Sequence, residues 1–197
     1  MALAAICASG AYGQSASQII ADAAKKISSA PSLSASFTAT SPQGASEKGT
    51  LLIAREKFAM VTSGYGVWYD GENMWSYYKQ NGECSLTEPT EEELMEVNPF
   101  DIVSQCDKRY KAVLKKKTNT EFTIALTPLS HASDIKTATI VIDAATKLPK
   151  AIDARFANGG AIAISLTDVT VGAAVPQVSR FRFPVSQYPG VEVVDLR

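Results

Sequence analysis

The sequence predicts a mainly β protein with a few short helices. Most segments between Leu33 and Phe183 alternate apolar and polar residues with a period of two, which is typical of strands that turn one face to a core. Turn residues interrupt the alternation at short intervals, which predicts about eleven strands in a barrel or sandwich. Helical patterns are confined to Ser17–Ser29 and Pro89–Gln105. The second segment is expected to lie on the sheet as a small helical cover.

The composition is that of an ordinary folded domain. Of the 197 residues, 46% are hydrophobic and 20% are charged, which excludes a disordered or fibrous chain. The formal net charge of −1 gives no bulk attraction to nucleic acid. No apolar run reaches the ~18 residues that a membrane-spanning helix needs. We therefore expect a single domain over residues 14–197.

The N-terminal segment resembles a secretory signal peptide. Met1–Gly13 is uncharged and mostly small or apolar, and Ala11 and Gly13 are small residues that would precede a cleavage site before Gln14. The basic start of such a signal is missing, so the signal would be truncated; an uncleaved N-terminus is the alternative. Cys7 follows a bulky residue, which disfavours a lipid anchor. We expect an exported, soluble protein.

The N-terminal half predicts a helix followed by hairpins. Apolar residues of Ser17–Ser29 share one stripe of a 3.6-residue period, and Pro31 ends the helix. The period changes to two in Leu33–Ala39. The pair Asp70-Gly71 supplies the positive φ of a tight turn and predicts a hairpin. The other strands expected in this half are Gly49–Ala54, Lys57–Ser63, Val67–Asp70, Asn73–Lys79 and Glu83–Thr87.

The C-terminal half predicts further strands joined by polar turns. Phe122, Ile124 and Leu126 alternate with smaller or polar residues, and Phe181 and Phe183 are expected to point inward from a closing strand. The strands expected here are Lys108–Lys117, Glu121–Pro128, Lys136–Ile142, Lys150–Phe156, Ala161–Thr170 and Ser179–Phe183. No repeat or low-complexity linker divides them, so they belong to one domain.

The segment Pro89–Gln105 is expected to form two short amphipathic helices. Thr90 and Glu93 have the spacing of a capping box, and Asn98-Pro99 ends one helix and begins the next. Helices this short are unstable alone in water. We therefore expect a lid that lies on an apolar face of the sheet through Leu94, Met95, Val97, Phe100 and Val103.

Cys84 and Cys106 flank this segment on either side. In an oxidising compartment a disulfide between them would close the base of the lid and stabilise the fold by about 3 kcal/mol. The alternative is two unrelated buried thiols.

The sequence contains no recognisable catalytic or metal-binding pattern. The single histidine, His131, lies in a polar loop without a nearby cluster of metal ligands. Phosphate-binding loops, nucleophile elbows and Ser/His/Asp arrangements are also missing. We therefore expect neither a metal, a cofactor nor enzymatic activity, with a secreted β-barrel enzyme as the less favoured alternative. The lysines of Lys108–Lys117 face either an anionic partner or, more commonly for such a strand, solvent.

The inward positions favour a cavity for an apolar ligand. Many of them hold medium-sized side chains beside a few large rings, and thin barrels either fill their interior or leave a cavity. A well-packed core under two cover helices is the alternative. The strand residues expected to line the cavity are Phe37, Leu52, Phe58, Met60, Trp75, Phe122, Ile140, Ile152 and Ile162.

Several segments, taken in order, resemble the periplasmic outer-membrane lipoprotein carrier proteins (LolA-like). They are Ser34–Phe37, Leu51–Phe58, Tyr69–Tyr77, Asn98–Phe100, and Phe181–Phe183 followed by Pro189–Val191. The resemblance covers most of residues 14–197, although no single segment is specific.

The resemblance implies an unclosed antiparallel half-barrel of about eleven strands with a short-helix lid over a hydrophobic cavity. It implies a monomeric periplasmic carrier that takes lipid-modified lipoproteins from an inner-membrane transporter and delivers them to an outer-membrane acceptor or to the membrane itself. Arg55 matches the family arginine that hydrogen-bonds the lid, with a plain edge-strand arginine as the alternative. A single-domain lipid- or lipoprotein-binding envelope sensor is the alternative function.

Overall fold

The computed structural model describes residues 14–90, 93–94, 101–130 and 133–197. The expected signal segment, residues 1–13, lies outside this range, and the division into signal and domain stays a prediction.

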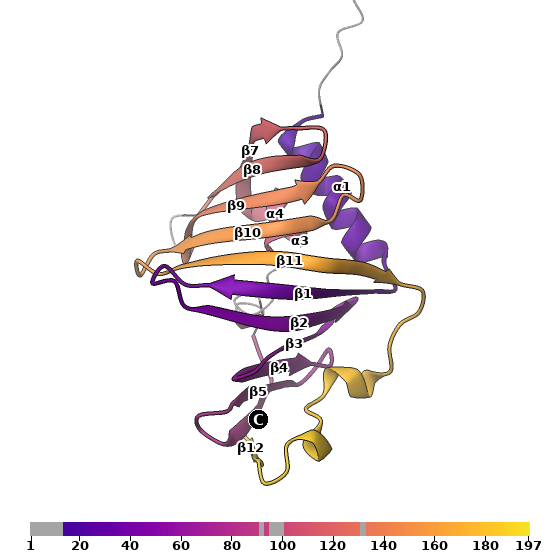
Figure 1. Ribbon diagram of the computed structural model, residues 1–197, viewed down its shortest axis with the longest axis vertical. Coiled ribbons are helices and arrows are strands. Elements are labelled where there is room, and N and C mark those ends of the chain that lie inside the picture. Colours follow the sequence, from indigo (N-terminus) through magenta and orange to yellow (C-terminus); the bar gives the residue numbers. More distant parts are fainter. Residues whose placement is uncertain (1–13, 91–92, 95–100, 131–132) are drawn as a thin grey trace, which may run out of the picture.

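A single sheet organises the described part of the chain (Figure 1). Its 12 strands follow the spatial order β12-β6-β5-β4-β3-β2-β1-β11-β10-β9-β8-β7. The strands are β1 Ser32–Thr40, β2 Ser46–Ala54, β3 Lys57–Thr62, β4 Tyr65–Tyr69, β5 Met74–Tyr78, β6 Glu83–Thr87, β7 Tyr110–Lys117, β8 Glu121–Pro128, β9 Ile135–Asp143, β10 Pro149–Phe156, β11 Ala161–Gly172 and β12 Glu192–Asp195.

The sheet is open because its two edge strands, β7 and β12, do not pair with each other. Neighbouring strands are antiparallel except β12 and β6, which are parallel. In the middle of the sheet β1 pairs with both β2 and β11, which joins the two halves of the chain. The predicted fold class, a mainly β unclosed sheet with short helices, is confirmed.

Two predicted details of the strands are wrong. The strand expected at Ser179–Phe183 is instead the 3-10 helix η1, Val178–Phe181, followed by a second short helix η2, Val185–Gln187. Its alternation of Phe and Arg has the period of a strand. In the structure this segment packs across one face of the sheet and pairs with none of its strands. Strand β12 was not expected, because four residues that follow a turn give little periodic signal.

The helices cover one face of the sheet, which we call the inner face (Figure 1). They are α1 Ala16–Ser29, α3 Asp101–Ser104 and α4 Cys106–Arg109. The predicted first helix is confirmed: Ser15 caps its N-terminus by accepting the Gln18 N–H at 3.1 Å. Its apolar stripe packs Ile19, Ile20 and Ala23 into the core. Helices α3 and α4 pack against α1, and α4 leads directly into β7.

Each face of the sheet carries its own hydrophobic core. The main core lies on the inner face and includes residues of β1–β4, β7–β11 and the helices. The outer core lies on the opposite face of β2–β6, where the C-terminal segment after β11 covers it with Phe181, Phe183 and Tyr188. Alternation along the strands assigns neighbouring residues to the two cores: Leu51 and Ile53 belong to the main core, and Leu52 belongs to the outer core.

Candidate hydrophobic ligand site

The inner face presents a continuous apolar surface across the sheet. The register places buried residues opposite one another on successive strands: Phe37 faces Leu166, and Ile140 faces both Ile152 and Ile124. Of the predicted cavity residues, those fully buried on this face are Phe37, Phe58, Phe122, Ile140 and Ile152, and those partly buried are Met60 and Ile162.

Two of the predicted cavity residues lie on the wrong face. Leu52 and Trp75 pack in the outer core, not in the main core. Leu52 lies in an uninterrupted apolar run, Leu51-Leu52-Ile53. Because apolar and polar residues do not alternate there, the sequence did not indicate which face of the sheet Leu52 occupies. Trp75 is the register partner of Trp68 on β4, and both side chains pack in the outer core. The prediction that these two side chains line the inner cavity is therefore wrong.

The start of the predicted lid has the expected capping box. The Thr90 N–H donates to Glu93 Oε2 at 2.8 Å, and the Glu93 N–H donates to Thr90 Oγ1 at 3.2 Å. Leu94 is partly buried against the main core, and Val103 in α3 is only 1% exposed there. Met95, Val97 and Phe100 lie outside the described residues. The described part of the lid thus turns apolar side chains toward the inner face.

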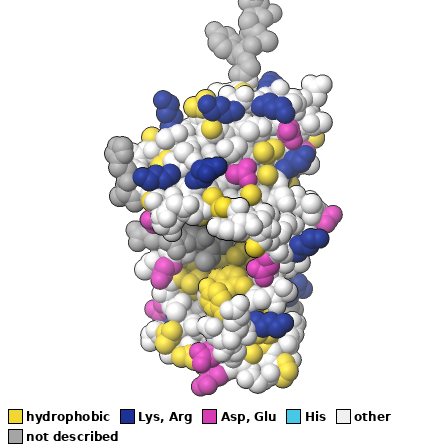
Figure 2. Space-filling model, turned by 60° about the vertical axis from the view of Figure 1, so that its left-hand side comes forward, with side chains coloured by type: hydrophobic (Ala, Val, Ile, Leu, Met, Phe, Trp, Pro, Cys, Tyr) yellow, Lys and Arg dark blue, Asp and Glu magenta, His cyan; other side chains and the backbone are white. Residues whose placement is uncertain are grey.

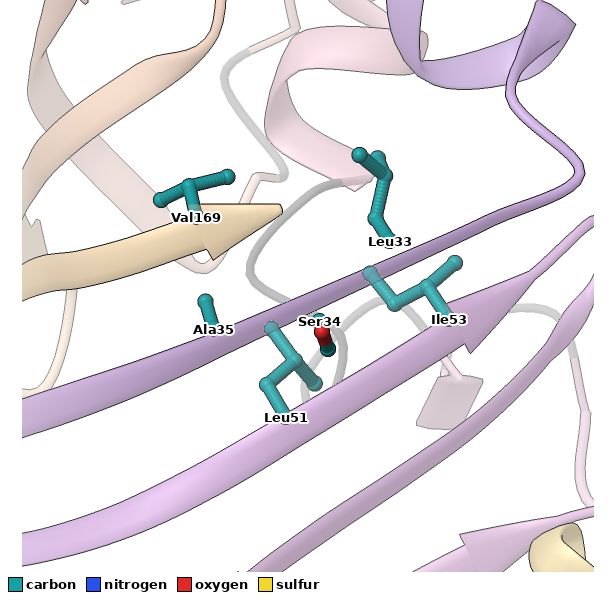
Figure 3. Close-up of a pocket in the computed structure, with 6 residues that line it drawn as sticks. All are labelled: Leu33, Ser34, Ala35, Leu51, Ile53 and Val169. Carbon is teal, nitrogen blue, oxygen red and sulfur yellow. The ribbon is translucent and has the colours of Figure 1, made fainter. Parts of the chain in front are cut away.

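A small apolar hollow lies on the inner face where β1, β2 and β11 meet (Figure 3). It is a shallow depression without room for a water molecule inside, and it is lined by Leu33, Ser34, Ala35, Leu51, Ile53 and Val169. The β1–β11 register shifts between Ser34 and Ser36, and Asp168 adopts a positive φ of 53° beside Val169. Binding pockets for small molecules usually measure roughly 300–1,000 Å³, so this depression holds no part of an alkyl chain in its present form.

Partly buried apolar residues extend the main core along β3, β4 and β5. Figure 2 shows hydrophobic side chains lining a recess at about this height of the molecule. The residues of these strands that border the core are Met60, Tyr65, Tyr69 and Met74. The Tyr65 ring lies 4.5 Å from the Tyr78 ring, and burial, followed by the neighbouring Tyr78, raises the pKa of the Tyr65 hydroxyl. Tyr65 therefore stays neutral, as an apolar surface requires.

Arg55 occupies the tight turn between β2 and β3. It is exposed, with a positive φ of 57°. It borders a charged hollow of about 620 Å³ together with Lys57, Glu72, Arg182 and their neighbours in the turns and the C-terminal segment. The structure thus places Arg55 at the end of the β2–β3 hairpin, and its role as a lid latch stays a prediction.

Asp70 ties the C-terminal segment to the sheet beside this hollow. Its side chain is only 3% exposed. The carboxylate accepts a hydrogen bond from Arg182 Nε at 2.7 Å and from the backbone N–H groups of Glu72 and Asn73 at 3.2 and 3.0 Å. Burial by itself would raise the pKa of the Asp70 carboxyl, but these bonds outweigh it and hold the pKa below its usual value. Sequence analysis identified Asp70 only as a turn residue, because its partner lies far along the chain.

The proposed disulfide does not form. Cys84 and Cys106 are free, buried thiols. Cys84 belongs to the outer core and Cys106 to the main core, so the sheet separates their side chains. Burial raises the pKa of both thiols to about 11, which makes them unreactive near neutral pH. Positions on either side of a loop suggested the pairing, but they carried no information about which face each side chain occupies.

Within the described ranges, no group of three or more His, Cys, Asp or Glu residues is placed to hold a metal ion. His131 lies outside those ranges. Over the same part of the chain, none of the helices combines the length and the apolar character that a membrane crossing requires.

Comparison with known proteins identifies the family. The sequence model described as "Outer membrane lipoprotein carrier protein LolA" matches residues 7–158. No curated protein matches the chain.

Two solved structures are similar to the chain at low sequence identity. An uncharacterized conserved protein from Thermus thermophilus has a TM-score of 0.60 at 9% identity, covering 91% of this chain and 98% of that one. A LolA superfamily protein from Nitrosomonas europaea has a TM-score of 0.43 at 11% identity, covering 87% and 99%. At such identity the Thermus protein supports the fold alone. The match of the family model over most of the sequence shows that the chain belongs to the outer membrane lipoprotein carrier protein LolA family.

Proposed function

We propose that this protein is a periplasmic carrier for lipid-modified proteins, and that their acyl chains bind between the inner face and the lid. The observation that carries the proposal is the continuous apolar inner face of an open sheet, covered by short helices. Membership of the family supports this assignment. We further propose that an inner-membrane transporter loads the carrier and that an outer-membrane acceptor, or the membrane itself, receives the cargo.

The free energy of hiding acyl chains from water explains why a carrier is needed. Each CH₂ group transferred from water to an apolar site gains roughly 0.8 kcal/mol, so one long acyl chain gains on the order of 10 kcal/mol. The small hollow beside Leu33 and Leu51 does not hold such a chain, so binding must open the site.

The lid is the part whose displacement costs least. Helices α3 and α4 have four residues each, and the side chains that they bury fully are Val103 and Cys106. Full burial of a Val-sized side chain contributes roughly 1.5–3 kcal/mol. Ile102, Val103 and Cys106 together therefore contribute less than the roughly 10 kcal/mol that one acyl chain gains. A bound acyl chain can therefore displace α3 and α4 from the inner face and occupy the space that they leave.

Native mass spectrometry of the protein taken from its own periplasm tests the proposal. We expect acylated protein bound to the wild type, less of it bound to Leu94→Asp, and wild-type amounts bound to the control Leu196→Asp, which is 62% exposed. Absence of any bound acyl mass would contradict the proposal. Bound free lipid without lipoprotein would instead support an envelope sensor.

The proposed latch is tested separately by Arg55→Leu. If Arg55 helps to hold the lid closed, this variant loads cargo normally but releases it more slowly in a reconstituted donor–acceptor assay. Arg55→Lys keeps the charge at the same turn position and controls for a general electrostatic effect. Normal release by Arg55→Leu would exclude the latch while leaving the carrier function intact.

A further inference from the structure

Basic residues are concentrated at one end of the sheet. Figure 2 shows that Lys and Arg side chains dominate the upper part of the molecule, where β7–β10 lie in Figure 1, and that most Asp and Glu side chains lie below. Between Cys106 and Lys117 the only acidic residue is Asp107. The basic side chains of this stretch, which we call the basic edge, are Lys108, Arg109, Lys111, Lys115, Lys116 and Lys117.

The basic edge is fully accessible. All six side chains are exposed, and β7 is the terminal strand of the sheet, paired only with β8. The β7–β8 register shifts between Leu114 and Lys116, so Lys115 lies in an irregular part of the strand. Lysines on an edge strand protect it against pairing with other chains. Protection of the edge strand explains the lysine charges, but it does not explain the exposed apolar side chains that lie among the lysines.

Two large aliphatic side chains are exposed within the basic edge. Val113 is 42% exposed and lies between Lys111 and Lys115 on β7. Leu129 is 62% exposed and adjoins Arg109, whose carbonyl oxygen accepts the Leu129 N–H at 2.8 Å. Exposed aliphatic groups set among basic residues are typical of surfaces that lie in the interface of an anionic bilayer.

We propose that the basic edge is an interaction surface for anionic lipid bilayers. The lysines contact the anionic headgroups, and Val113 and Leu129 enter the interface between headgroups and acyl chains. An acidic protein satisfies the charges equally well, but scattered aliphatic side chains fit the fluid bilayer better than a rigid protein surface. The surface lies outside the proposed cargo site, so this inference goes beyond the carrier function and stands without it.

Docking at the basic edge also places the lid close to the membrane. Arg109 ends α4 and Tyr110 begins β7 without an intervening loop, and α3 packs against α4. A bilayer bound at β7 therefore lies next to the helices through which we propose that acyl chains enter and leave.

Vesicle co-sedimentation of the cargo-free full chain tests the inference. We expect binding to vesicles of phosphatidylglycerol and phosphatidylethanolamine, at least tenfold weaker binding to vesicles of the neutral lipid alone, and weaker binding as salt is added. Each lysine near an anionic surface strengthens binding about fivefold, so Lys111→Gln, Lys115→Gln and Lys116→Gln together should weaken it roughly 100-fold.

A matched control removes the same charge elsewhere. Lys48→Gln, Lys79→Gln and Arg180→Gln together alter three exposed residues away from the basic edge and should leave vesicle binding unchanged. The pair Val113→Ser and Leu129→Ser should weaken binding about tenfold, and this loss should persist at high salt. Circular dichroism and thermal unfolding verify that each variant is folded.

Three results would overturn the inference. Equal binding to neutral and anionic vesicles would exclude recognition by charge. Equal losses in the two triple variants would exclude the basic edge as the site. Binding to polyglutamate that the lysine variant weakens, with no effect of Val113→Ser and Leu129→Ser on vesicle binding, would assign the surface to acidic macromolecules instead. None of these measurements involves cargo, so their failure is distinct from failure of the carrier proposal.

Discussion

The two faces of the sheet are covered by parts of the chain that differ in length and chemistry. On the outer face, one continuous C-terminal segment buries Phe181 completely and places Phe183 within 5.3 Å of Trp68 and 5.0 Å of Tyr188, measured between ring centroids. The ion pair of Arg182 with Asp70 joins the same segment to the turn after β4. On the inner face, the cover beside the long helix α1 consists of α3 and α4, single turns that bury mainly Val103 and Cys106.

The comparison indicates which cover is held more strongly. Aromatic rings contribute large buried areas and specific pair contacts, and a buried carboxylate with three bonds resists separation from its partners. Single helical turns with small buried side chains contribute much less. The outer core therefore holds its cover more strongly, and α3 and α4 form the cover that our proposal expects a ligand to displace. The following predictions test this difference, from the largest expected effect to the smallest.

Phe183→Ala should have the largest effect on stability. Removing this ring from the outer core leaves a cavity among Trp68, Tyr77 and Tyr188, and such substitutions cost roughly 3–5 kcal/mol. Urea unfolding measures the loss. Val185→Ala, at a residue that is 57% exposed in the same segment, should change stability by less than about 0.5 kcal/mol. Similar small losses for both variants would show that the outer cover is not fixed by its rings.

Asp70→Asn should have an intermediate effect that depends on pH. Because the folded protein lowers the pKa of Asp70, its charge stabilises the fold above the unfolded pKa of about 3.9, and this contribution disappears as the pH falls through the folded pKa. Asparagine keeps the turn acceptor but loses the charged bond to Arg182, so we expect a loss of about 2 kcal/mol at pH 7.

Unfolding of the Asp70→Asn variant at several pH values checks the sign. The difference from the wild type should be full at pH 7 and should shrink below a pH of about 4. Asp143→Asn is the control, since Asp143 accepts turn N–H groups from Ala145 and Thr146 and its pKa is also lowered, without an arginine partner. A pH-independent loss in Asp70→Asn would mean that packing, not charge, accounts for it.

The sequence predicted the inner face better than the outer one. Strict alternation in Phe122-Thr123-Ile124 predicts that Phe122 and Ile124 share the buried face of a strand, and the structure confirms this. On β2 and β5, by contrast, both faces are covered, so apolar residues occupy consecutive positions and periodicity no longer distinguishes the faces of Leu52 and Trp75. The aromatic excess of β4 and β5 was the available signal for a second core, because a single covered face needs fewer rings.

The contacts between distant segments were beyond prediction. The pairing of Asp70 with Arg182 joins residues 112 positions apart, and β12 pairs with β6 through only four residues. The disulfide failed for the same reason, since nothing local to Cys84 or Cys106 reveals its face. The capping box of Thr90 and Glu93 was predictable because all of its atoms lie within one turn of helix.

Val103→Ala should reduce global stability modestly and speed ligand uptake. The lost burial costs about 1 kcal/mol, much less than Phe183→Ala on the other face. If α3 must lift before an acyl chain enters, the same change lowers the cost of opening, and uptake should become about fivefold faster. Stopped-flow binding of a fluorescent fatty acid measures the rate, with Val175→Ala, at a residue that is 46% exposed, as the control. Slower uptake would show that Val103 contacts the ligand more than it restrains the cover.

Thr90→Ala should have the smallest effect on global stability and a clear local one. It removes the hydroxyl that accepts the Glu93 N–H, and loss of such a cap destabilises its own helical turn by about 1 kcal/mol. Since little of the core depends on this turn, global unfolding should shift by less than about 0.5 kcal/mol. Exchange of the Leu94 N–H, which bonds the Thr90 carbonyl oxygen at 3.1 Å, should accelerate about fivefold, while Thr90→Ser should exchange like the wild type. A global loss as large as the local one would mean that this end of the lid unfolds only with the whole domain, which contradicts a cover that opens independently.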